Sequence, residues 1–358
     1  MNALKIVIFG LSHGHTRKYY DCLKTNRLLE WVGVCSDDPV LRDRFEKGGH
    51  GVPCYESEDA LLAAHPDVEA AVLASSNDDH LRQVHICCER GIHILSMKIP
   101  TFDLAEYDEM IRRVESADLV CQVELELHYN PVMERVKQTL QTGSLGGLRS
   151  VQGTNITLSP VWAFPWQGIP EKSYGARIPL RAGDSRFRGG ALCDHPHLFD
   201  LMRWLTGSDF EHVYADVAPN LRDDLEVEDM LFVNGRMQDG TVFLLDPSWS
   251  RMEERLEVPG PGWEVFPKRM EVNLTLSAES GMMLADCFGP NVYHNGAPND
   301  RYTVQYTYFD EWIGLVDEFV RCIRQHRTPR INLRWHRRTI QAMNACYESV
   351  QNEAPVFF

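Results

Sequence analysis

The sequence predicts an α/β domain built on a doubly wound parallel sheet, followed by an α+β domain with an antiparallel sheet. In residues 1–123, short apolar runs without alternation are interleaved with helical patterns, as in β-α-β units whose strands are buried on both faces. After about residue 150, longer and partly alternating runs appear, which is typical of antiparallel strands. A chain of 358 residues is long enough for two domains. We place them at 1–123 and 124–358, with the C-terminal helices free to pack back on the first domain.

Each element of the first domain has its own signal. The apolar runs predicted as strands are 6–9, 31–35, 70–74, 93–95 and 119–123. After the third run, Asn77 is expected to cap a helix, because its side chain can accept a backbone N–H. Gly91 is expected to end that helix, since glycine readily adopts the left-handed conformation found there.

The second domain is predicted from patterns of a different period. Its expected strands are 229–238, 241–249, 270–276 and 281–285, with Asp239 and Gly240 forming a hairpin turn between the first two. Apolar spacing predicts helices over 197–206 and 311–325. Residues 158–190 lack periodicity, and a loop of that length in a compact domain is usually functional or mobile. Its aromatic and basic residues are candidates to shape a pocket for an acidic ligand: Trp162, Trp166, Arg177, Arg181, Arg186 and Arg188.

Composition and charge exclude several classes of protein. The chain carries 36 Lys and Arg against 51 Asp and Glu, a net charge of −15, which disfavours binding to nucleic acid or to an anionic membrane surface. No apolar run approaches the length of about 20 residues that spans a bilayer, and the apolar start is too short for a secretory signal. The ten cysteines contain no C-x-x-C pattern. They are interpreted as reduced core residues of a cytoplasmic protein.

A strand, a turn and a helix start follow one another at the N-terminus. A dinucleotide-binding turn has the pattern G-x-G-x-x-G, which lets backbone N–H groups approach the pyrophosphate. Gly10 stands in register, whereas Ser12 replaces the second glycine and His15 the third; Ser12 is small, and its hydroxyl suits a phosphate. An ordinary strand-to-helix turn is the alternative. Valine at Gly10 is expected to abolish dinucleotide binding and leave the fold largely intact.

Two further features refine the cofactor prediction. His13 and His15 raise the question of a metal site, but no third ligand stands at a fixed spacing, so no metal is predicted. Asp37 follows the second strand, where an acidic residue accepts hydrogen bonds from the adenosine ribose. Its charge would repel the 2′-phosphate of NADP, so NAD is favoured. The neighbouring Asp38 is expected to cap the next helix, because a proline follows it.

Three further segments strengthen this interpretation. Residues 67–80 are predicted to form a strand that ends in a polar turn, and residues 91–100 a strand that ends in a lysine. Residues 189–200 are predicted to contain the start of a helix, with the sequence Asp-His-Pro-His. Together with His-Tyr-Asn-Pro at 128–131 and the Gly-rich turn at 142–147, they resemble the Gfo/Idh/MocA family, named for glucose–fructose oxidoreductase and inositol dehydrogenase. The resemblance extends over nearly the whole chain, from about residue 5 to residue 356.

The resemblance implies an N-terminal NAD(P)-binding Rossmann domain and a C-terminal α+β domain with a large, mainly antiparallel open sheet. That sheet commonly forms subunit contacts, which implies a homodimer or homotetramer. Ser36 stands where the family often has its aspartate, so NADP is the alternative cofactor. The residues implied to bind the cofactor are Gly10, Ser12, His13, His15, Ser36, Asp37, Ser75, Asn77, His80 and Lys98.

The resemblance also implies a reaction centre. Lys98 matches the lysine of the family's E-K-P motif, although Met97 replaces the glutamate and Ile99 stands between the lysine and the proline. Asp194 matches the aspartate of its D-x-x-x-H motif. The histidine comes one residue early, at His197, and a spacing of three residues still shares a helix face. His195 is the alternative for the same role.

These residues suit the oxidation of an alcohol. His197 would remove the hydroxyl proton as hydride leaves the carbon, because a histidine titrates near neutral pH. Lys98 would stabilise the developing alkoxide, and Asp194 would hold a neighbouring hydroxyl or orient the histidine. The expected activity is hydride transfer between nicotinamide and a hydroxyl of a sugar, sugar acid or cyclitol. The alternatives are a non-catalytic NAD(P)-binding sugar sensor and a redox-neutral, NAD-dependent glycoside-cleaving enzyme.

Overall fold

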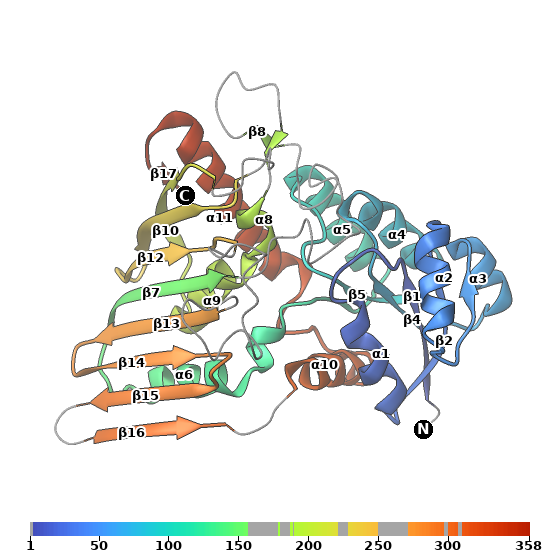
Figure 1. The fold of residues 1–358 in the computed structure, drawn as a ribbon, viewed down its shortest axis with the longest axis horizontal. Coiled ribbons are helices and arrows are strands. Elements are labelled where there is room, and N and C mark those ends of the chain that lie inside the picture. The colour runs from blue at the N-terminus through green and yellow to red at the C-terminus, as the bar shows by residue number, and fades with distance from the viewer. Residues whose placement is uncertain are drawn as a thin grey trace. The chain divides into compact units, whose positions relative to one another are not determined.

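The computed structural model describes residues 3–156, 178–179, 187–188, 190–220, 228–249, 271–296, 300–306 and 310–358. These residues form two compact units, each with its own sheet (Figure 1). The first unit contains the chain up to Leu125 together with Trp312–Arg338. The second begins at Glu126 and also contains Thr339–Phe358. The residues singled out in the 158–190 loop (Trp162, Trp166, Arg177, Arg181 and Arg186) lie outside the described part, as does the side chain of Arg188.

The sheet of the first unit has six parallel strands in the order β3-β2-β1-β4-β5-β6. The strands are β1 Leu4–Phe9, β2 Leu29–Cys35, β3 Cys54–Tyr55, β4 Ala70–Leu73, β5 His93–Ser96 and β6 Cys121–Val123. This order confirms the predicted doubly wound sheet. The strand order reverses between β1 and β4, and ligands of such sheets bind outside the carboxyl ends of the strands at that point.

Helices connect these strands: α1 Thr16–Thr25, α2 Pro39–Lys47, α3 Glu58–Ala64, α4 Asn77–Arg90 and α5 Leu104–Ser116. The predicted cap of α2 is confirmed, because Asp38 accepts the N–H groups of Val40 and Leu41. Helix α4 begins at Asn77, so Ser76 and not Asn77 is its capping residue. Gly91 ends α4 with φ of 70°, as predicted. Helix α10, Glu311–Gln325, also packs here, through a hydrogen bond from the Gln122 side chain of β6 to the Leu315 carbonyl.

The second unit contains a nine-stranded sheet in the order β16-β15-β14-β13-β7-β12-β11-β10-β17. The strands are β7 Leu148–Ile156, β10 Phe210–Val217, β11 Leu231–Met237, β12 Val242–Asp246, β13 Glu271–Ala278, β14 Gly281–Asp286, β15 Asn291–Gly296, β16 Asp300–Gln305 and β17 Val356–Phe357. Only β7 and β12 pair in parallel; the other neighbours are antiparallel. The predicted, mainly antiparallel sheet is therefore confirmed. A separate two-stranded sheet joins β8 Ile178–Pro179 and β9 Phe187–Arg188.

Helices cover one face of the nine-stranded sheet. Helix α6, Pro131–Thr142, packs on β14 and β15, and α9, Pro196–Thr206, packs on β7 (Figure 1). The 3-10 helix η1, Glu126–Tyr129, packs against both helices. Helix α11, Leu333–Asn352, runs through the C-terminal part of the chain.

The prediction that Asp194 and His197 share one helix face is wrong. Asp194 is the last residue of a short helix, α8 (Ala191–Asp194), and His197 lies in the first turn of α9. Between them, His195 has φ of −118° and ψ of 56°, which is not helical. The cause is Pro196, because a proline lacks a backbone N–H and disfavours helical geometry in the residue before it.

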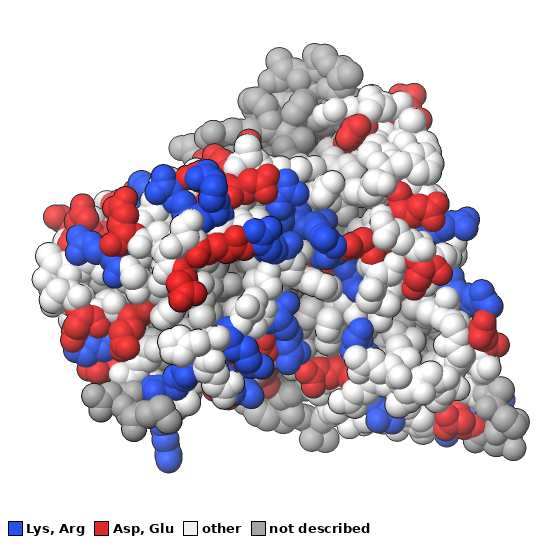
Figure 2. Space-filling model, turned by 180° about the vertical axis from the view of Figure 1, so that it is seen from behind, with Lys and Arg blue, Asp and Glu red and all other residues white. Residues whose placement is uncertain are grey.

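Charged side chains of both signs are interspersed over the face shown in Figure 2. Several arginines of the basic stretch 321–338 are paired with acidic residues. These pairs join Arg330 to Glu318, Arg334 to Glu115 and Arg337 to Asp108. All ten cysteines are free thiols, and within the described chain no helix is long and apolar enough to cross a bilayer.

Candidate functional site

Gly10 makes the turn at the carboxyl end of β1. Its φ is +87°, a conformation that glycine adopts without strain. Its N–H donates to the carbonyl of Cys35 at 2.9 Å, which ties the turn to the end of β2. A Cβ added to Gly10 would lie 2.5 Å from the backbone of Ser75. The turn therefore requires glycine because it approaches the loop after β4 closely.

The loops after β1, β4 and β5 are held together at this edge of the sheet. His13 donates its backbone N–H to the Ala74 carbonyl at 3.0 Å and its ring Nε2–H to the Lys98 carbonyl at 2.9 Å. His80, in α4, donates from Nδ1 to the carbonyl of Pro100 at 3.0 Å. The structure thus brings together His13, His80 and Lys98, which the sequence singled out from three separate segments.

Burial controls the protonation of these histidines. Burial lowers the pKa of His80 to about 4, so the ring is neutral at pH 7. Burial also lowers the pKa of His13 well below its usual value, and the nearby Lys98 ammonium adds to the effect. Both rings therefore act as neutral hydrogen-bonding groups in this part of the site.

The remaining predicted cofactor residues lie around the same edge. Ser75 is buried and donates its hydroxyl to Gln83, while Asn77 is the first residue of α4. Ser36 is also buried, and its carbonyl accepts a hydrogen bond from the Arg42 guanidinium at 2.6 Å. Asp37 is exposed and Ser12 is partly exposed.

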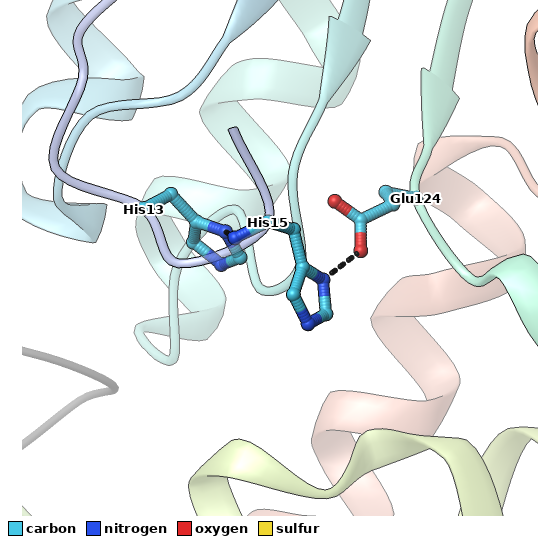
Figure 3. Close-up of side chains that lie close together, drawn as sticks. All are labelled: His13, His15 and Glu124. Carbon is cyan, nitrogen blue, oxygen red and sulfur yellow. Dashed lines mark hydrogen bonds and ion pairs between the residues drawn. The ribbon is translucent and has the colours of Figure 1, made fainter. Parts of the chain in front are cut away.

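His13, His15 and Glu124 form a compact cluster beside the Gly10 turn (Figure 3). His15 Nδ1 and Glu124 Oε1 are 2.8 Å apart, and the Tyr19 hydroxyl donates to the other carboxylate oxygen at 3.3 Å. One ligand atom from each of the three residues lies within 4.8 Å of the others. Glu124 follows His15 by 109 positions, which is why no fixed spacing in the sequence indicated it.

The hydrogen bonds in this cluster argue against a resident cation. Nε2 of His13 donates to the Lys98 carbonyl, and Nδ1 accepts the backbone N–H of His15 at 3.1 Å, so a metal would have to displace one of these bonds. The Lys98 ammonium acts electrostatically on His13 and would repel a cation there as well. The cluster is better suited to bracing the start of α1 against the end of β6.

In the second unit, Asp194 and His195 are held by specific bonds. The Trp249 indole N–H donates to Asp194 Oδ2 at 3.0 Å. His195 Nε2 lies 3.9 Å from the same oxygen, and its Nδ1–H donates to the carbonyl of Ala191 at 2.8 Å. Both residues are almost fully buried, at 3% and 1% exposure. The backbone bond fixes the orientation of the His195 ring.

His197 has a different carboxylate as its neighbour. Its Nε2 lies 3.6 Å from Glu126 Oε1, which is within ion-pair distance but longer than a hydrogen bond. Glu126 comes from η1, and His197 from the first turn of α9. Both side chains are largely buried, so their interaction is weakly screened by water.

A buried carboxylate, that of Glu228, positions α8. It accepts the N–H groups of Gly190 at 3.0 Å and Leu192 at 3.2 Å, and the Tyr347 hydroxyl donates to it at 2.7 Å. The Tyr347 oxygen also lies 3.1 Å from the Cys193 sulfur. Burial raises the pKa of Glu228, although these donors oppose the rise. This set of bonds holds the turn that presents Asp194.

Sequence reasoning missed four residues of these arrangements: Glu124, Glu126, Trp249 and Glu228. The two glutamates at 124 and 126 did carry a signal, because they interrupt an apolar run directly after a predicted strand. Trp249 and Glu228 stand at the ends of predicted strands, where a buried polar contact has no sequence signature. Their partners are 36 to 119 positions away.

Comparisons with known proteins agree with this architecture. The model described as "Oxidoreductase family, NAD-binding Rossmann fold" matches residues 4–125, and "GFO/IDH/MocA C-terminal domain" matches residues 133–275. The chain is 24% identical to myo-inositol 2-dehydrogenase of Thermotoga maritima over 249 residues, 67% of this chain and 68% of that protein. It is 26% identical to the rhizopine catabolism protein MocA of Rhizobium meliloti over 183 residues, and spans only 51% of that relative.

Solved structures with low sequence identity share the fold. Levoglucosan dehydrogenase in complex with NADH and levoglucosan has a TM-score of 0.78 at 16% identity, with 99% of each chain covered. An oxidoreductase from Agrobacterium radiobacter in complex with NAD+, L-tartaric acid and magnesium has a TM-score of 0.79 at 16% identity, covering 99% of this chain and 98% of that one. The two family models, with the glycine turn and the two sheets described above, lead to one conclusion: the chain belongs to the Gfo/Idh/MocA family of NAD-binding oxidoreductases.

Proposed function

We propose that the protein is an NAD(P)-dependent dehydrogenase that transfers hydride between nicotinamide and a hydroxyl of a sugar, sugar acid or cyclitol. The observation that carries this proposal is the buried Lys98 at the carboxyl edge of the first sheet, next to the glycine turn of an NAD-binding Rossmann domain. A lysine at that position can stabilise the alkoxide that forms as hydride departs. Asp194 and His197 complete the proposed reaction centre.

The residues at the carboxyl edge suit a dinucleotide. The Gly10 turn leads directly into α1, and backbone N–H groups at a helix start favour a pyrophosphate. When bound, the cofactor supplies an electrophilic ring carbon that accepts hydride. The protein's part is to hold the hydroxyl, remove its proton at His197 and exclude water.

The names of relatives support a polyol or sugar substrate. The chain resembles an enzyme named for myo-inositol, and its structural neighbours include proteins crystallised with levoglucosan and L-tartaric acid. All three compounds carry adjacent hydroxyl groups. Two neighbouring hydroxyls suit a site in which His197 takes one proton and Asp194 accepts a hydrogen bond from the second group.

The decisive experiment incubates the pure protein with NAD, or with NADP, and a panel of sugars, sugar acids and cyclitols. A dehydrogenase produces net NADH or NADPH, which is measured by absorbance, and it also produces a ketone or lactone. Glycoside cleavage without net NADH would indicate the redox-neutral reaction instead. Binding of dinucleotide and sugar with no turnover of any substrate would support the sensor.

Asp37 is expected to set the preference for NAD. The change Asp37→Ser removes an acceptor for the adenosine ribose hydroxyls and the charge that repels a 2′-phosphate. We expect NADH affinity to fall about tenfold, the effect of losing one charged hydrogen bond, and the NADPH affinity to rise. Fluorescence titration with both cofactors measures this, with Asp43→Ser on α2 as an exposed control. An unchanged NADH/NADPH ratio would show that Asp37 points away from the ribose.

We also propose a homodimer or homotetramer formed through the nine-stranded sheet. On the face away from α6 and α9, this sheet carries apolar side chains that are 42–48% exposed among the described residues: Val242, Leu244, Met282, Leu284 and Tyr293. Strand register places Tyr293, Leu284, Thr275, Gln152 and Leu244 in one row across five strands. Exposed apolar surface of this extent commonly marks an interface between protein chains.

Leu284→Lys tests this interface. A charge in the middle of the apolar row is expected to shift the protein to monomers, because burying an unpaired ammonium against a second sheet is costly. Light scattering coupled to size-exclusion chromatography measures the mass of each variant. Val40→Lys is the control, since Val40 is 62% exposed on α2 of the first unit. A Leu284→Lys protein with the mass of the wild type would place the interface elsewhere.

We further propose a cytoplasmic location, where the ten free thiols stay reduced. Burial raises the pKa of Cys87, Cys193 and Cys287 well above the usual value, so these thiols are expected to be unreactive at neutral pH. The partners expected are a small polyol or sugar and the cofactor, with no nucleic acid and no membrane.

A further inference from the structure

The carboxylate of Glu126 faces the proposed base His197 inside the second unit. Glu126 Oε1 lies 3.6 Å from His197 Nε2, with 12% and 7% of the two side chains exposed. The elements that carry them, η1 and α9, pack against each other. A carboxylate that is removed from water is costly unless a charge or hydrogen bonds compensate it. A buried acid beside a histidine is therefore a candidate for a functional pair.

We infer that Glu126 is the positioning residue for His197 and determines which ring nitrogen accepts the substrate proton. This inference rests on the proposed function, in which His197 is the general base. An ionised carboxylate only accepts hydrogen bonds, so it favours the tautomer that carries its proton on Nε2. The lone pair of the neutral ring then lies on Nδ1, which becomes the basic atom.

The proposed step balances as follows. The substrate O–H bond breaks and its proton goes to Nδ1 of His197, which becomes an imidazolium. The C–H bond of the same carbinol group also breaks, its hydride would go to NAD(P)+ when that cofactor is bound, and a C=O bond remains in the product. Glu126 stabilises that imidazolium and keeps the ring oriented, as the carboxylate of a Ser-His-Asp triad does. Distances between such groups commonly shorten once substrate is bound.

The contacts of Asp194 support giving this role to Glu126. The family resemblance suggested that Asp194 could orient the histidine, but Asp194 Oδ2 accepts the Trp249 indole N–H and lies 3.9 Å from His195. Pro196 separates α8 from α9, so Asp194 and His197 do not share a helix face. Asp194 remains suited to holding a substrate hydroxyl.

Other titratable groups on the elements around His197 are compensated in different ways. His128 of η1 is hydrogen-bonded to Asp200 of α9. Arg203 of α9 pairs with Asp209, and Lys137 of α6 donates to the Trp204 carbonyl. Asp194 accepts the Trp249 indole N–H, and His195 donates to the Ala191 carbonyl. Removing the charge of Glu126 is therefore expected to change the titration of His197 directly.

The first test is Glu126→Gln, which keeps the shape of the side chain but removes its charge. With NAD and an active polyol, we expect kcat to fall at least about tenfold, while KM and NADH affinity stay within about twofold. The neutral form of His197 is the active base, and the negative charge of Glu126 favours the protonated form. Removing that charge is therefore expected to lower the pKa of His197. The acidic limb of the kcat–pH profile is therefore expected to move to lower pH. Glu126→Asp, which keeps the charge, should recover part of the rate.

A second measurement does not depend on turnover. The histidine rings are labelled with ¹⁵N and observed by NMR spectroscopy. The His197 signals are identified as those that disappear in the variant His197→Asn. We expect the Nε2–H tautomer in the wild type, a mixture of tautomers in Glu126→Gln, and a His197 pKa lower by about 1 in that variant. Glu318→Gln is the control, because Glu318 is another largely buried glutamate, paired with Arg330 in the first unit.

The outcomes separate this inference from the proposed function. Unchanged His197 tautomer and pKa in Glu126→Gln overturn the inference, whatever the enzyme's activity. If Glu126→Gln alters the His197 signals but the wild-type protein reduces no cofactor with any substrate, the pairing of Glu126 with His197 is upheld and the dehydrogenase assignment fails. An equal loss of rate in Glu318→Gln would mean that Glu126 acts only through stability.

Discussion

His197→Ala is expected to lower kcat by about 10²–10⁴-fold, because a general base typically contributes that much to a proton transfer. NADH affinity should not change, since His197 belongs to the second unit and the residues proposed to bind the cofactor belong to the first. Steady-state kinetics on the best polyol of the panel and a fluorescence titration with NADH measure the two quantities. The rate should not recover at higher pH, because the missing group is the base itself.

His195→Ala is the matched comparison for this variant. The ring of His195 is fixed by its bond to the Ala191 carbonyl and lies near Asp194, so its loss should disturb the position of Asp194 and raise KM more than it lowers kcat. A large loss of kcat in His195→Ala with little effect of His197→Ala would reverse the assignment of the base. Little effect of both changes would favour the sensor.

The parallel sheet was predictable because its strands are buried on both faces. Runs such as Ile6–Phe9 and Ala70–Leu73 contain no polar residue, so each was recognised from composition alone. Five strands of the second sheet were not predicted: β7, β10, β15, β16 and β17. Strands β15 and β16 expose one face to solvent and contain mostly polar residues, which leaves too weak an alternation to indicate a strand.

The candidate site was predictable only where one segment carries the whole signal. Gly10, Lys98 and Asp194 stand in local motifs, and the structure finds the first two at the expected edge of the first sheet. Glu126 and Trp249 touch their partners through contacts between distant segments, and such contacts follow from packing of the helices and strands. The helical pairing of Asp194 with His197 was predicted wrongly because spacing was considered without the effect of Pro196 on the helix.

Gly10→Val is expected to destabilise the first unit, which corrects the expectation that the fold would stay intact. A side chain at Gly10 meets the backbone of Ser75 at 2.5 Å, and backbone cannot rotate away as a flexible side chain can. The conformation with φ of +87° adds strain for any residue other than glycine. We expect the free energy of unfolding to fall by about 2–5 kcal/mol, the sum of overpacking and backbone strain.

Gly49→Val separates these two contributions. Gly49 also has a positive φ, of +63°, but a Cβ there would have no atom within 4 Å. It should therefore show the backbone strain alone, and urea denaturation of both variants gives the contribution of the Ser75 contact by difference. Equal stability of the two variants would show that the loop after β4 can move away. In that case Gly10→Val would test dinucleotide binding directly. If Gly10→Val is much less stable than Gly49→Val, a loss of NADH affinity in Gly10→Val reports a disrupted turn.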